Sequence, residues 1–128
     1  MKLLLDTHIL LWVAGRSARL SSRARALIED QGNELIFSAA SVWEVALKRQ
    51  NTDADFGADP SVLRRALVDS GYTELPVTGV HAAATVALPK GHKDPFDRLL
   101  LAQAITEGMT LITADAVLAR YPGPIRKV

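Results

Sequence analysis

The 128-residue sequence contains no cysteine, has no long apolar run and carries almost no excess charge. The lack of cysteine excludes a disulfide framework and a thiolate metal site, and it fits a reducing compartment. No stretch approaches the roughly 20 apolar residues that a membrane helix needs. Fifteen Lys and Arg oppose fourteen Asp and Glu, which leaves a net charge of +1. No global field therefore draws the chain to nucleic acid or anionic lipid, and any polyanion must be bound by a local arrangement of charges.

The start of the chain has the outline of a signal peptide, with one lysine followed by apolar residues. Asp6 and His8 interrupt this run, and the remaining pieces are shorter than the 7–15 apolar residues that a signal peptide requires. We therefore expect a soluble, cytoplasmic, unprocessed protein with no membrane segment. The length and the 48% hydrophobic content predict a single globular domain over residues 1–128.

Short apolar segments alternate with segments of helical spacing along the chain. The predicted strands are 3–5, 35–37, 74–77, 110–113 and 125–128. The predicted helices are 8–14, 22–30, 38–50 (which Ser38 or Ser41 opens), 60–71, 78–89, 95–108 and 116–120, and residues 51–59 are predicted to form a loop. Pro76 favours an edge position for the third strand. Strands that alternate with helices indicate an α/β fold with a mostly parallel sheet covered on both faces.

Four acidic residues stand in apolar surroundings. Asp6 directly follows the first predicted strand, and Asp115 closely follows the fourth. Glu44 and Asp97 lie near the starts of predicted helices, among residues that form cores. Burying a charged carboxylate costs several kcal/mol unless something pairs with it. The positions of these four acids therefore need an explanation.

Taken one at a time, all four can be explained as helix-capping residues. The two acids that follow strands each precede a predicted helix and can accept its free N–H groups. Ser41 and Glu44 have the spacing of a capping box. Asp94 can cap the helix that begins at Pro95, and Asp97 then lies in its first turn, where the helix dipole favours a negative charge.

Taken together, the four acids share a location in the predicted fold. Ligands of an open parallel sheet bind outside the carboxyl ends of its strands, and all four acids are expected to lie at that edge of the sheet. Carboxylates that converge there repel each other, and the surrounding motifs place no cluster of lysines to neutralise them. Mg²⁺ or Mn²⁺ takes oxygen ligands and needs only one or two direct carboxylates. Thr7, Ser38 and Thr113 offer hydroxyl groups beside the acids. Such a site suits phosphodiester hydrolysis, because the metal lowers the pKa of the attacking water.

Four segments, in order along nearly the whole chain, carry these residues. They are Leu3–His8, Ser38–Glu44, His92–Leu100 and Leu111–Asp115. Together they resemble the PIN-domain family of metal-dependent ribonucleases, and closely its VapC-type toxins. The resemblance implies a compact three-layer α/β/α sandwich on a mostly parallel sheet. It also implies an endoribonuclease toxin of a toxin–antitoxin module, which uses Mg²⁺ or Mn²⁺ to cleave single-stranded or loop RNA and leaves 5′-phosphate and 3′-hydroxyl ends.

The resemblance also implies roles for individual residues. Asp6, Glu44, Asp97 and Asp115 match the acidic quartet of the family, and Thr113 matches the hydroxyl that helps to place the water. The implied metal ligands are Asp6, Asp97 and Asp115, of which Asp6 and Asp97 are the most direct. The family further implies a homodimer and an antitoxin partner whose C-terminal segment covers the acidic site.

Several neighbours of the acids are candidates for contact with RNA. The substrate-binding candidates are Thr7, Ser38, Lys93 and Arg98. Lys90 adds to a small basic rim that suits an RNA backbone. His92 could also touch the substrate, Asp94 could assist Asp97, and Arg98 could instead form a surface ion pair.

Two other enzyme classes of similar fold fit the sequence poorly. A phosphorylated receiver domain needs paired acids after the first strand, but Thr7 and His8 follow Asp6. A haloacid-dehalogenase-type phosphatase needs a second aspartate two residues after the first, where His8 stands. A catalytically silent PIN-like module that binds protein or RNA is the remaining alternative, although no acid of the quartet is missing.

Overall fold

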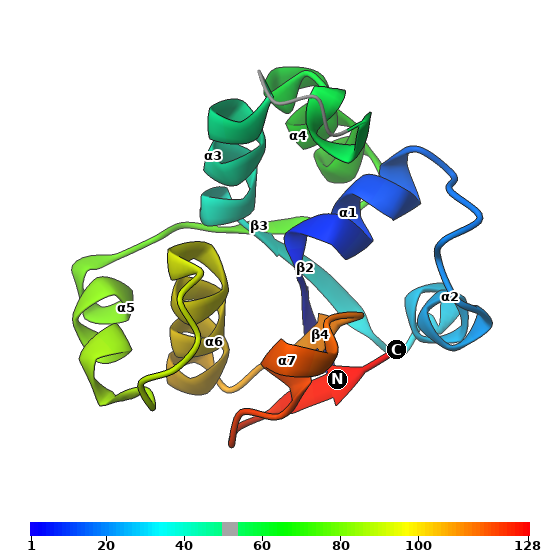
Figure 1. The fold of residues 1–128 in the computed structure, drawn as a ribbon. Helices are drawn as coiled ribbons and strands as arrows, with labels where there is room; N and C mark the ends of the chain where they lie inside the picture. The colour runs from blue at the N-terminus through cyan, green and yellow to red at the C-terminus, as the bar shows by residue number, and fades with distance from the viewer. Residues whose placement is uncertain (50–53) are drawn as a thin grey trace.

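The computed structural model describes residues 1–49 and 54–128, which contain a five-stranded sheet (Figure 1). The strands lie in the order β3-β2-β1-β4-β5, and every neighbouring pair is parallel. They are β1 (Lys2–Leu5), β2 (Glu34–Ser38), β3 (Thr73–Leu75), β4 (Thr110–Thr113) and β5 (Ile125–Lys127). The prediction of a mostly parallel sheet is confirmed, and β3, which Pro76 follows, lies at its edge.

Helices connect the strands, as the alternating pattern predicts. The α-helices are α1 (Thr7–Ala14), α2 (Ser22–Glu29), α3 (Ala39–Lys48), α4 (Pro60–Asp69), α5 (Gly79–Ala84), α6 (Pro95–Glu107) and α7 (Ala116–Ala119). Two short 3₁₀ helices, η1 (Ala54–Gly57) and η2 (Thr85–Ala87), complete the described elements. Each parallel crossover thus contains a helix, as such connections usually do.

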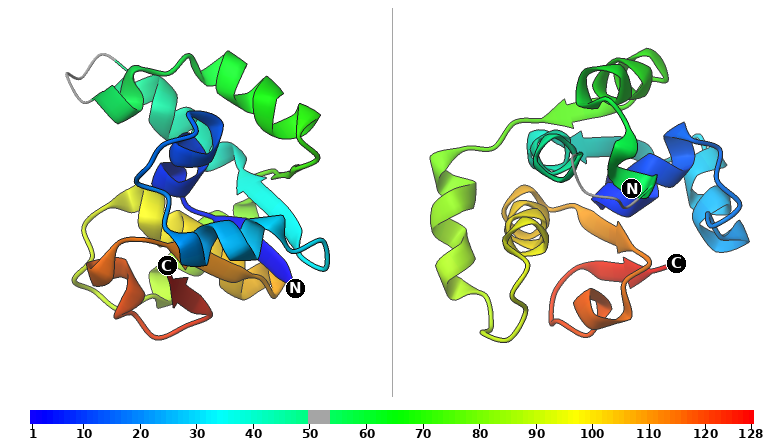
Figure 2. Two further views of the ribbon diagram at one scale, coloured as in Figure 1. Left: turned by 90° about the vertical axis from the view of Figure 1, so that its right-hand side faces the viewer. Right: turned by 45° about the horizontal axis from the view of Figure 1, so that its top comes forward.

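Two apolar cores, one on each face of the sheet, make the fold a three-layer sandwich. Leu3 and Leu5 of β1 belong to one core, together with Ile9 of α1 and Leu67 of α4. Leu4, between the two leucines, belongs to the other core, which α6 and α7 cover. Successive side chains of a strand point to opposite faces, so three consecutive leucines supply both cores. Figure 2 shows the helical layers on the two sides of the sheet, which confirms the predicted α/β/α architecture.

The predicted loop at 51–59 is wrong at residues 54–57, while residues 58 and 59 belong to no helix or strand, as predicted. Residues 51–53, and Gln50 at the end of the predicted third helix, lie outside the described residues. Ala54–Gly57 forms the 3₁₀ helix η1. The reason is Phe56, which is buried in the core against α1 and α3 and anchors an otherwise polar segment.

The predicted helix at 78–89 is also divided, into α5 and η2. In a continued α-helix the carbonyl of Thr85 would accept the N–H of residue 89, but Pro89 has none. The guanidinium of Arg98 donates to the Thr85 carbonyl instead, at 2.9 Å, and to the Pro89 carbonyl at 2.7 Å. The segment before α6 is thereby held against that helix.

The carboxyl ends of the central strands lie at one edge of the sheet. β1 and β4 are neighbours with Leu5 opposite Ile112, so the residues that follow them emerge side by side. The backbone N–H of Asp6 still bonds to the carbonyl of Ile112, at 3.0 Å, which extends the pairing by one residue. This edge therefore brings Asp6 next to the end of β4.

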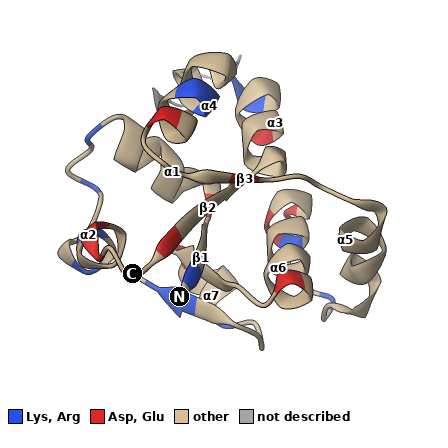
Figure 3. Cartoon of the chain, turned by 180° about the vertical axis from the view of Figure 1, so that it is seen from behind, with Lys and Arg blue, Asp and Glu red and all other residues tan. Residues whose placement is uncertain are grey.

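Residues of both charge signs are distributed along the chain, as the colours of the cartoon in Figure 3 show. This distribution agrees with the net charge of +1. In the part of the chain that the structure describes, no helix combines the length and the apolarity needed to cross a membrane.

Candidate active site

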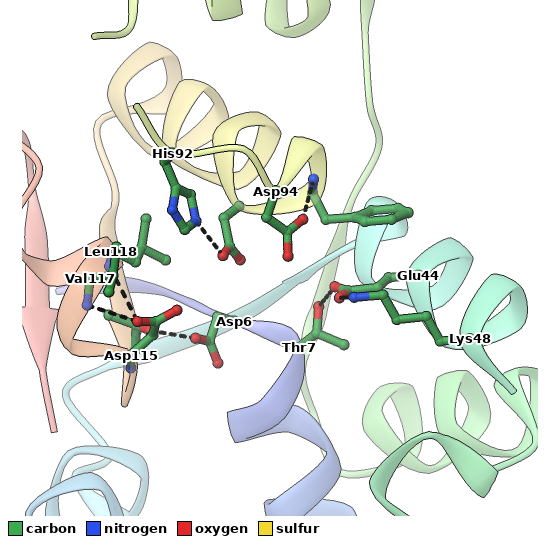
Figure 4. Close-up of polar contacts among 12 residues, drawn as sticks. Asp6, Thr7, Glu44, Lys48, His92, Asp94, Asp115, Val117 and Leu118 are labelled. Carbon is green, nitrogen blue, oxygen red and sulfur yellow. Dashed lines mark hydrogen bonds and ion pairs between the residues drawn. The ribbon is translucent and has the colours of Figure 1, made fainter. Parts of the chain in front are cut away.

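Asp6 caps a helix and also enters the site at the sheet edge (Figure 4). Its Oδ1 accepts the backbone N–H of Ile9 at 3.0 Å, and its Oδ2 accepts the hydroxyl of Thr113 from the end of β4. The residue is only 5% exposed. Burial raises the pKa of Asp6 to about 6, although the two hydrogen bonds lower it. A buried acid with a raised pKa beside other acids marks a candidate functional site.

Asp97 lies in the first turn of α6, next to His92. Its Oδ2 is 2.7 Å from Nε2 of the His92 imidazole. Burial raises the pKa of Asp97, the bond to His92 opposes this, and the nearby charge of Asp94 adds to the rise. Asp94 caps α6 by accepting the backbone N–H of Phe96 at 2.9 Å. The capping role predicted for Asp94 is confirmed, and Asp97 faces the other acids.

Asp115 caps α7 at the exposed side of the site. Its Oδ1 accepts the backbone N–H groups of Val117 and Leu118, at 2.8 and 3.4 Å. Its own N–H donates to the hydroxyl of Thr113 at 3.0 Å. Thr113 therefore connects Asp115 to Asp6, since the same hydroxyl donates to the Asp6 carboxylate.

Glu44 is buried inside α3, and the predicted capping box with Ser41 is wrong. The helix begins at Ala39 and is capped by Ser38, whose hydroxyl accepts the N–H of Ala40 at 3.0 Å. Glu44 thus lies in the second turn and caps nothing. Its Oε1 accepts the hydroxyl of Thr7 at 2.6 Å.

One lysine outside the four motifs pairs with Glu44. Lys48 follows one helical turn later, and its Nζ lies 2.7 Å from Oε2 of Glu44. The same ammonium group lies 5.0 Å from the ring centre of Phe56. The i, i+4 spacing of the pair is visible in the sequence and could have indicated it. Glu44 therefore has a lysine as its counterion.

These side chains line one small pocket of about 80 Å³. Its lining residues are Asp6, Thr7, His8, Glu44, Lys48, Asp94, Asp97 and Asp115. All four acids that the sequence singles out thus meet, although they come from separate segments of the chain. Carboxylate oxygens at this density are the donors that a hard divalent cation prefers, so the residues fit such an ion.

Within the described residues, one group of potential metal ligands includes a histidine. One donor atom each from His92, Asp97 and Asp115 lies within 4.8 Å of the other two. Asp6 lies outside this group, although it lines the same pocket. From the sequence, His92 is predicted only as a possible contact with the substrate. Its position five residues before Asp97, across the start of α6, is the signal that could have indicated a closer relation.

The substrate-binding candidates lie in different environments. Ser38 is completely buried and donates to Oε1 of Gln103 at 2.6 Å, so the prediction that it contacts a substrate is wrong. Thr7 is buried and orients Glu44. Lys93 is exposed, while Arg98 binds backbone carbonyls instead of forming the ion pair that the sequence left open. Substrate contacts by Thr7, Lys93 and Arg98 stay predictions.

Comparison with known proteins gives the family. A model of the PIN domain matches residues 3–124. The chain belongs to the PIN domain family. This PIN-domain protein is 34% identical to ribonuclease VapC22 of Mycobacterium tuberculosis over 125 residues, which are 95% of each chain. The resemblance seen in the sequence is therefore confirmed.

Solved structures show the same fold for this PIN-domain protein at low sequence identity. One is VapBC2 from Rickettsia felis bound to a DNA fragment from the promoter, with a TM-score of 0.72 and 15% identity over 100% of this chain and 99% of that chain. Another is VapBC-5 of Mycobacterium tuberculosis, a member of the VapBC family of toxin–antitoxin systems. It has a TM-score of 0.63 and 18% identity over 99% of this chain and 97% of that chain.

Proposed function

We propose that this PIN-domain protein is a Mg²⁺- or Mn²⁺-dependent endoribonuclease and the toxin of a toxin–antitoxin module. The observation that carries the proposal is the meeting of Asp6, Glu44, Asp97 and Asp115 around one pocket. Helix capping does not account for this arrangement, because Glu44 caps no helix. The relative of 34% identity is named a ribonuclease, which supports the same activity here.

The proposed metal ligands are Asp6, Asp97 and Asp115. A bound metal ion would lower the pKa of a water molecule and stabilise negative charge on the phosphate. Thr113 positions two of the ligands, since its hydroxyl donates to Asp6 and accepts the N–H of Asp115. Glu44 is held by its neighbours with its carboxylate at the pocket, where we propose that it orients the attacking water.

The proposed substrate is single-stranded or loop RNA. Attack of water on phosphorus with departure of the 3′ oxygen leaves a 5′-phosphate and a 3′-hydroxyl, the ends that we propose. Lys90 and Lys93 are exposed in the segment before α6, where positive charge can hold the flanking phosphates. Arg98 and Thr7 complete the proposed substrate-binding set beside the acids.

The proposed partners are a cognate antitoxin and a second copy of this chain, in the cytoplasm. The similarity to VapC22 and to a VapBC toxin–antitoxin structure supports the antitoxin. Trp43 and Leu47 of α3 are 58% and 56% exposed, and large exposed apolar side chains of this kind are often covered by protein partners.

Cleavage of a labelled single-stranded RNA, with mapping of the product ends, tests the proposal. We expect cleavage with Mg²⁺ or Mn²⁺, loss of cleavage in EDTA, and a loss of at least about 100-fold in Asp6→Asn and Asp97→Asn, since each variant removes a metal ligand. Asp69→Asn is the matched control, because Asp69 is exposed at the end of α4 and lies outside the pocket.

Full cleavage by both pocket variants would refute the metal-site assignment. Absence of cleavage by the folded wild-type protein with either ion, on RNAs of several sequences and loop structures, would favour a catalytically silent binding module. Products with a 2′,3′-cyclic phosphate would refute the water-attack mechanism, because they require attack by the ribose 2′ oxygen.

A further inference from the structure

His92 is not one of the residues that line the acidic pocket, but it contacts Asp97, which is one of them. Its Nε2 is 2.7 Å from Oδ2 of Asp97. A carboxylate oxygen of Asp115 approaches the same place, so that all three donor atoms lie within 4.8 Å of one another. The three residues come from the segment before α6, from α6 itself and from the start of α7. Figure 4 shows His92 and Asp115 on the same side of the site.

The separations agree with three ligands of one ion. In an octahedral site with metal–ligand bonds of about 2.1 Å, adjacent donors lie about 3 Å apart and opposite donors about 4.2 Å apart. The 2.7 Å between Nε2 of His92 and Oδ2 of Asp97 is a hydrogen-bond distance, and this bond keeps the two donors side by side. A donor atom of Asp115 lies within 4.8 Å of the other two, so His92, Asp97 and Asp115 would hold an ion through one nitrogen and two oxygen donors.

The imidazole is held in this orientation by its surroundings. The His92 side chain is 11% exposed. Its ring packs edge to face against the ring of Tyr121, with 5.4 Å between the ring centres and 71° between the ring planes. Arg98 binds the carbonyl of Pro89 and so ties the segment that carries His92 to α6. A ligand that is already ordered loses little side-chain entropy when it binds an ion.

We propose that His92 is a direct nitrogen ligand of the divalent ion, alongside Asp97 and Asp115. The site then has mixed nitrogen and oxygen donors and binds first-row transition-metal ions such as Mn²⁺ in preference to Mg²⁺, because imidazole is a poorer ligand for Mg²⁺. This inference rests on the proposed function only in requiring that the pocket holds a divalent ion.

The competing role for His92 is to orient Asp97 through an N–H bond from outside the coordination sphere. Histidines and carboxylates near metal sites often form such pairs. The two roles differ in one observable, since only a direct ligand places its nitrogen on the metal. Loss of activity in a His92 variant would fit both roles and therefore does not separate them.

Pulsed electron paramagnetic resonance of the Mn²⁺-loaded protein separates them. We expect a ¹⁴N coupling typical of a directly bound imidazole in the wild type and its loss in His92→Gln. His8→Gln is the matched control, because His8 lines the acidic pocket and is the other nearby imidazole. Thermal unfolding of each variant in EDTA checks that it is folded.

Calorimetric titration with Mn²⁺ and Mg²⁺ gives a second, independent measurement. Even the outer partners of metal ligands contribute 10- to 100-fold to affinity. We therefore expect His92→Gln to weaken Mn²⁺ binding by at least about tenfold and Mg²⁺ binding by clearly less. The preference for Mn²⁺ over Mg²⁺ should fall accordingly, while His8→Gln should retain it.

A wild-type spectrum without directly bound nitrogen, or a coupling that disappears in His8→Gln and persists in His92→Gln, would overturn the proposal. Equal weakening of both ions by His92→Gln would also contradict it. None of these measurements uses RNA. A protein that binds Mn²⁺ through His92 but cleaves no RNA would refute the proposed function and leave this inference standing.

Discussion

Asp6 has a local task and a long-range task in the same side chain. One carboxylate oxygen caps α1, and the other accepts the hydroxyl of Thr113, which lies 107 residues further along the chain. Burial raises its pKa to about 6. In the metal-free protein at neutral pH, folding must therefore bury a negatively charged carboxylate, and this destabilises the folded state.

The raised pKa predicts how the stability of the metal-free protein depends on pH. Between the unfolded pKa of about 3.8 and the folded pKa of about 6, the folded state binds more protons, so the Asp6 contribution to the free energy of unfolding falls as pH rises through this window. The difference between the two values corresponds to about 3 kcal/mol at pH 7. Asp6→Asn, which cannot ionise, should therefore be more stable than the wild type at pH 7 by up to that amount.

Urea denaturation in EDTA between pH 4 and pH 8 measures this effect. The advantage of Asp6→Asn should be largest above pH 6 and nearly absent at pH 4, where the wild-type carboxyl is protonated in the folded state. Because other groups titrate in both proteins, the difference between them isolates Asp6. If Asp6→Asn were less stable than the wild type at pH 7, the hydrogen bonds of the Asp6 carboxylate would contribute more to the free energy of unfolding than its buried charge costs.

Helix α3 shows how an element positions site residues through its starting point. With Ser38 as the cap, Glu44 lies in the second turn beneath Thr7, and Lys48 follows one turn later. A start at Ser41 would make Glu44 a capping residue in the first turn. The buried bond from Ser38 to Gln103 of α6 is a long-range contact that accompanies the earlier start.

This placement of the cap predicts different effects of two serine substitutions. Ser38→Ala removes the cap and the hydrogen bond to Gln103, and should lower the free energy of unfolding by about 2 kcal/mol. Ser41→Ala removes a buried hydroxyl that accepts the Thr7 hydroxyl at 2.9 Å but no helix cap, and Thr7 keeps its shorter bond to Glu44, so this substitution should cost less. Chemical denaturation of both variants in EDTA measures the difference, and a larger loss in Ser41→Ala would place the cap at the later serine.

At the scale of the whole molecule, the pocket joins parts that the chain keeps apart. The proposed ligands Asp6, Asp97 and Asp115 lie directly after β1, in the first turn of α6 and directly before α7. A bound ion would therefore connect the end of the central strand to two helices that cover one face of the sheet. An ion that binds only the folded chain stabilises the entire domain, by about 2.7 kcal/mol at 100 times its dissociation constant.

We therefore expect Mn²⁺ to raise the unfolding temperature of the wild type by several degrees, and EDTA to reverse the rise. Asp97→Asn should show a much smaller rise, because it loses a proposed ligand, and Asp69→Asn should behave as the wild type does. Differential scanning calorimetry with and without Mn²⁺ is the measurement. An equal rise in Asp97→Asn would place the stabilising ion elsewhere on the protein.

Much of the architecture was predictable because its causes are local. The apolar run Leu3–Leu5, the proline after β3 and the caps Asp94 and Asp115 all act within a few residues of themselves. The convergence of the acids was also predictable, since parallel strands place their carboxyl ends at one edge. At η1 and at the cap of α3, a distant apolar or polar partner outweighed the local preference that favoured a loop and a cap at Ser41. The division of the predicted helix at 78–89 instead has a local cause, because Pro89 has no N–H to continue the helix.

The sequence by itself determined the order of strands and helices, the two-sided cores and the family of the chain, because periodicity, capping and motif order are properties of neighbouring residues. Only the tertiary structure decided that Ser38 is buried with a hydrogen bond to Gln103, and that Thr113 forms hydrogen bonds with both Asp6 and Asp115. It also decided that His92 lies close to Asp97 and Asp115. A hydrogen bond needs two atoms within about 3 Å, and for side chains far apart along the chain only the packing of the elements sets that distance.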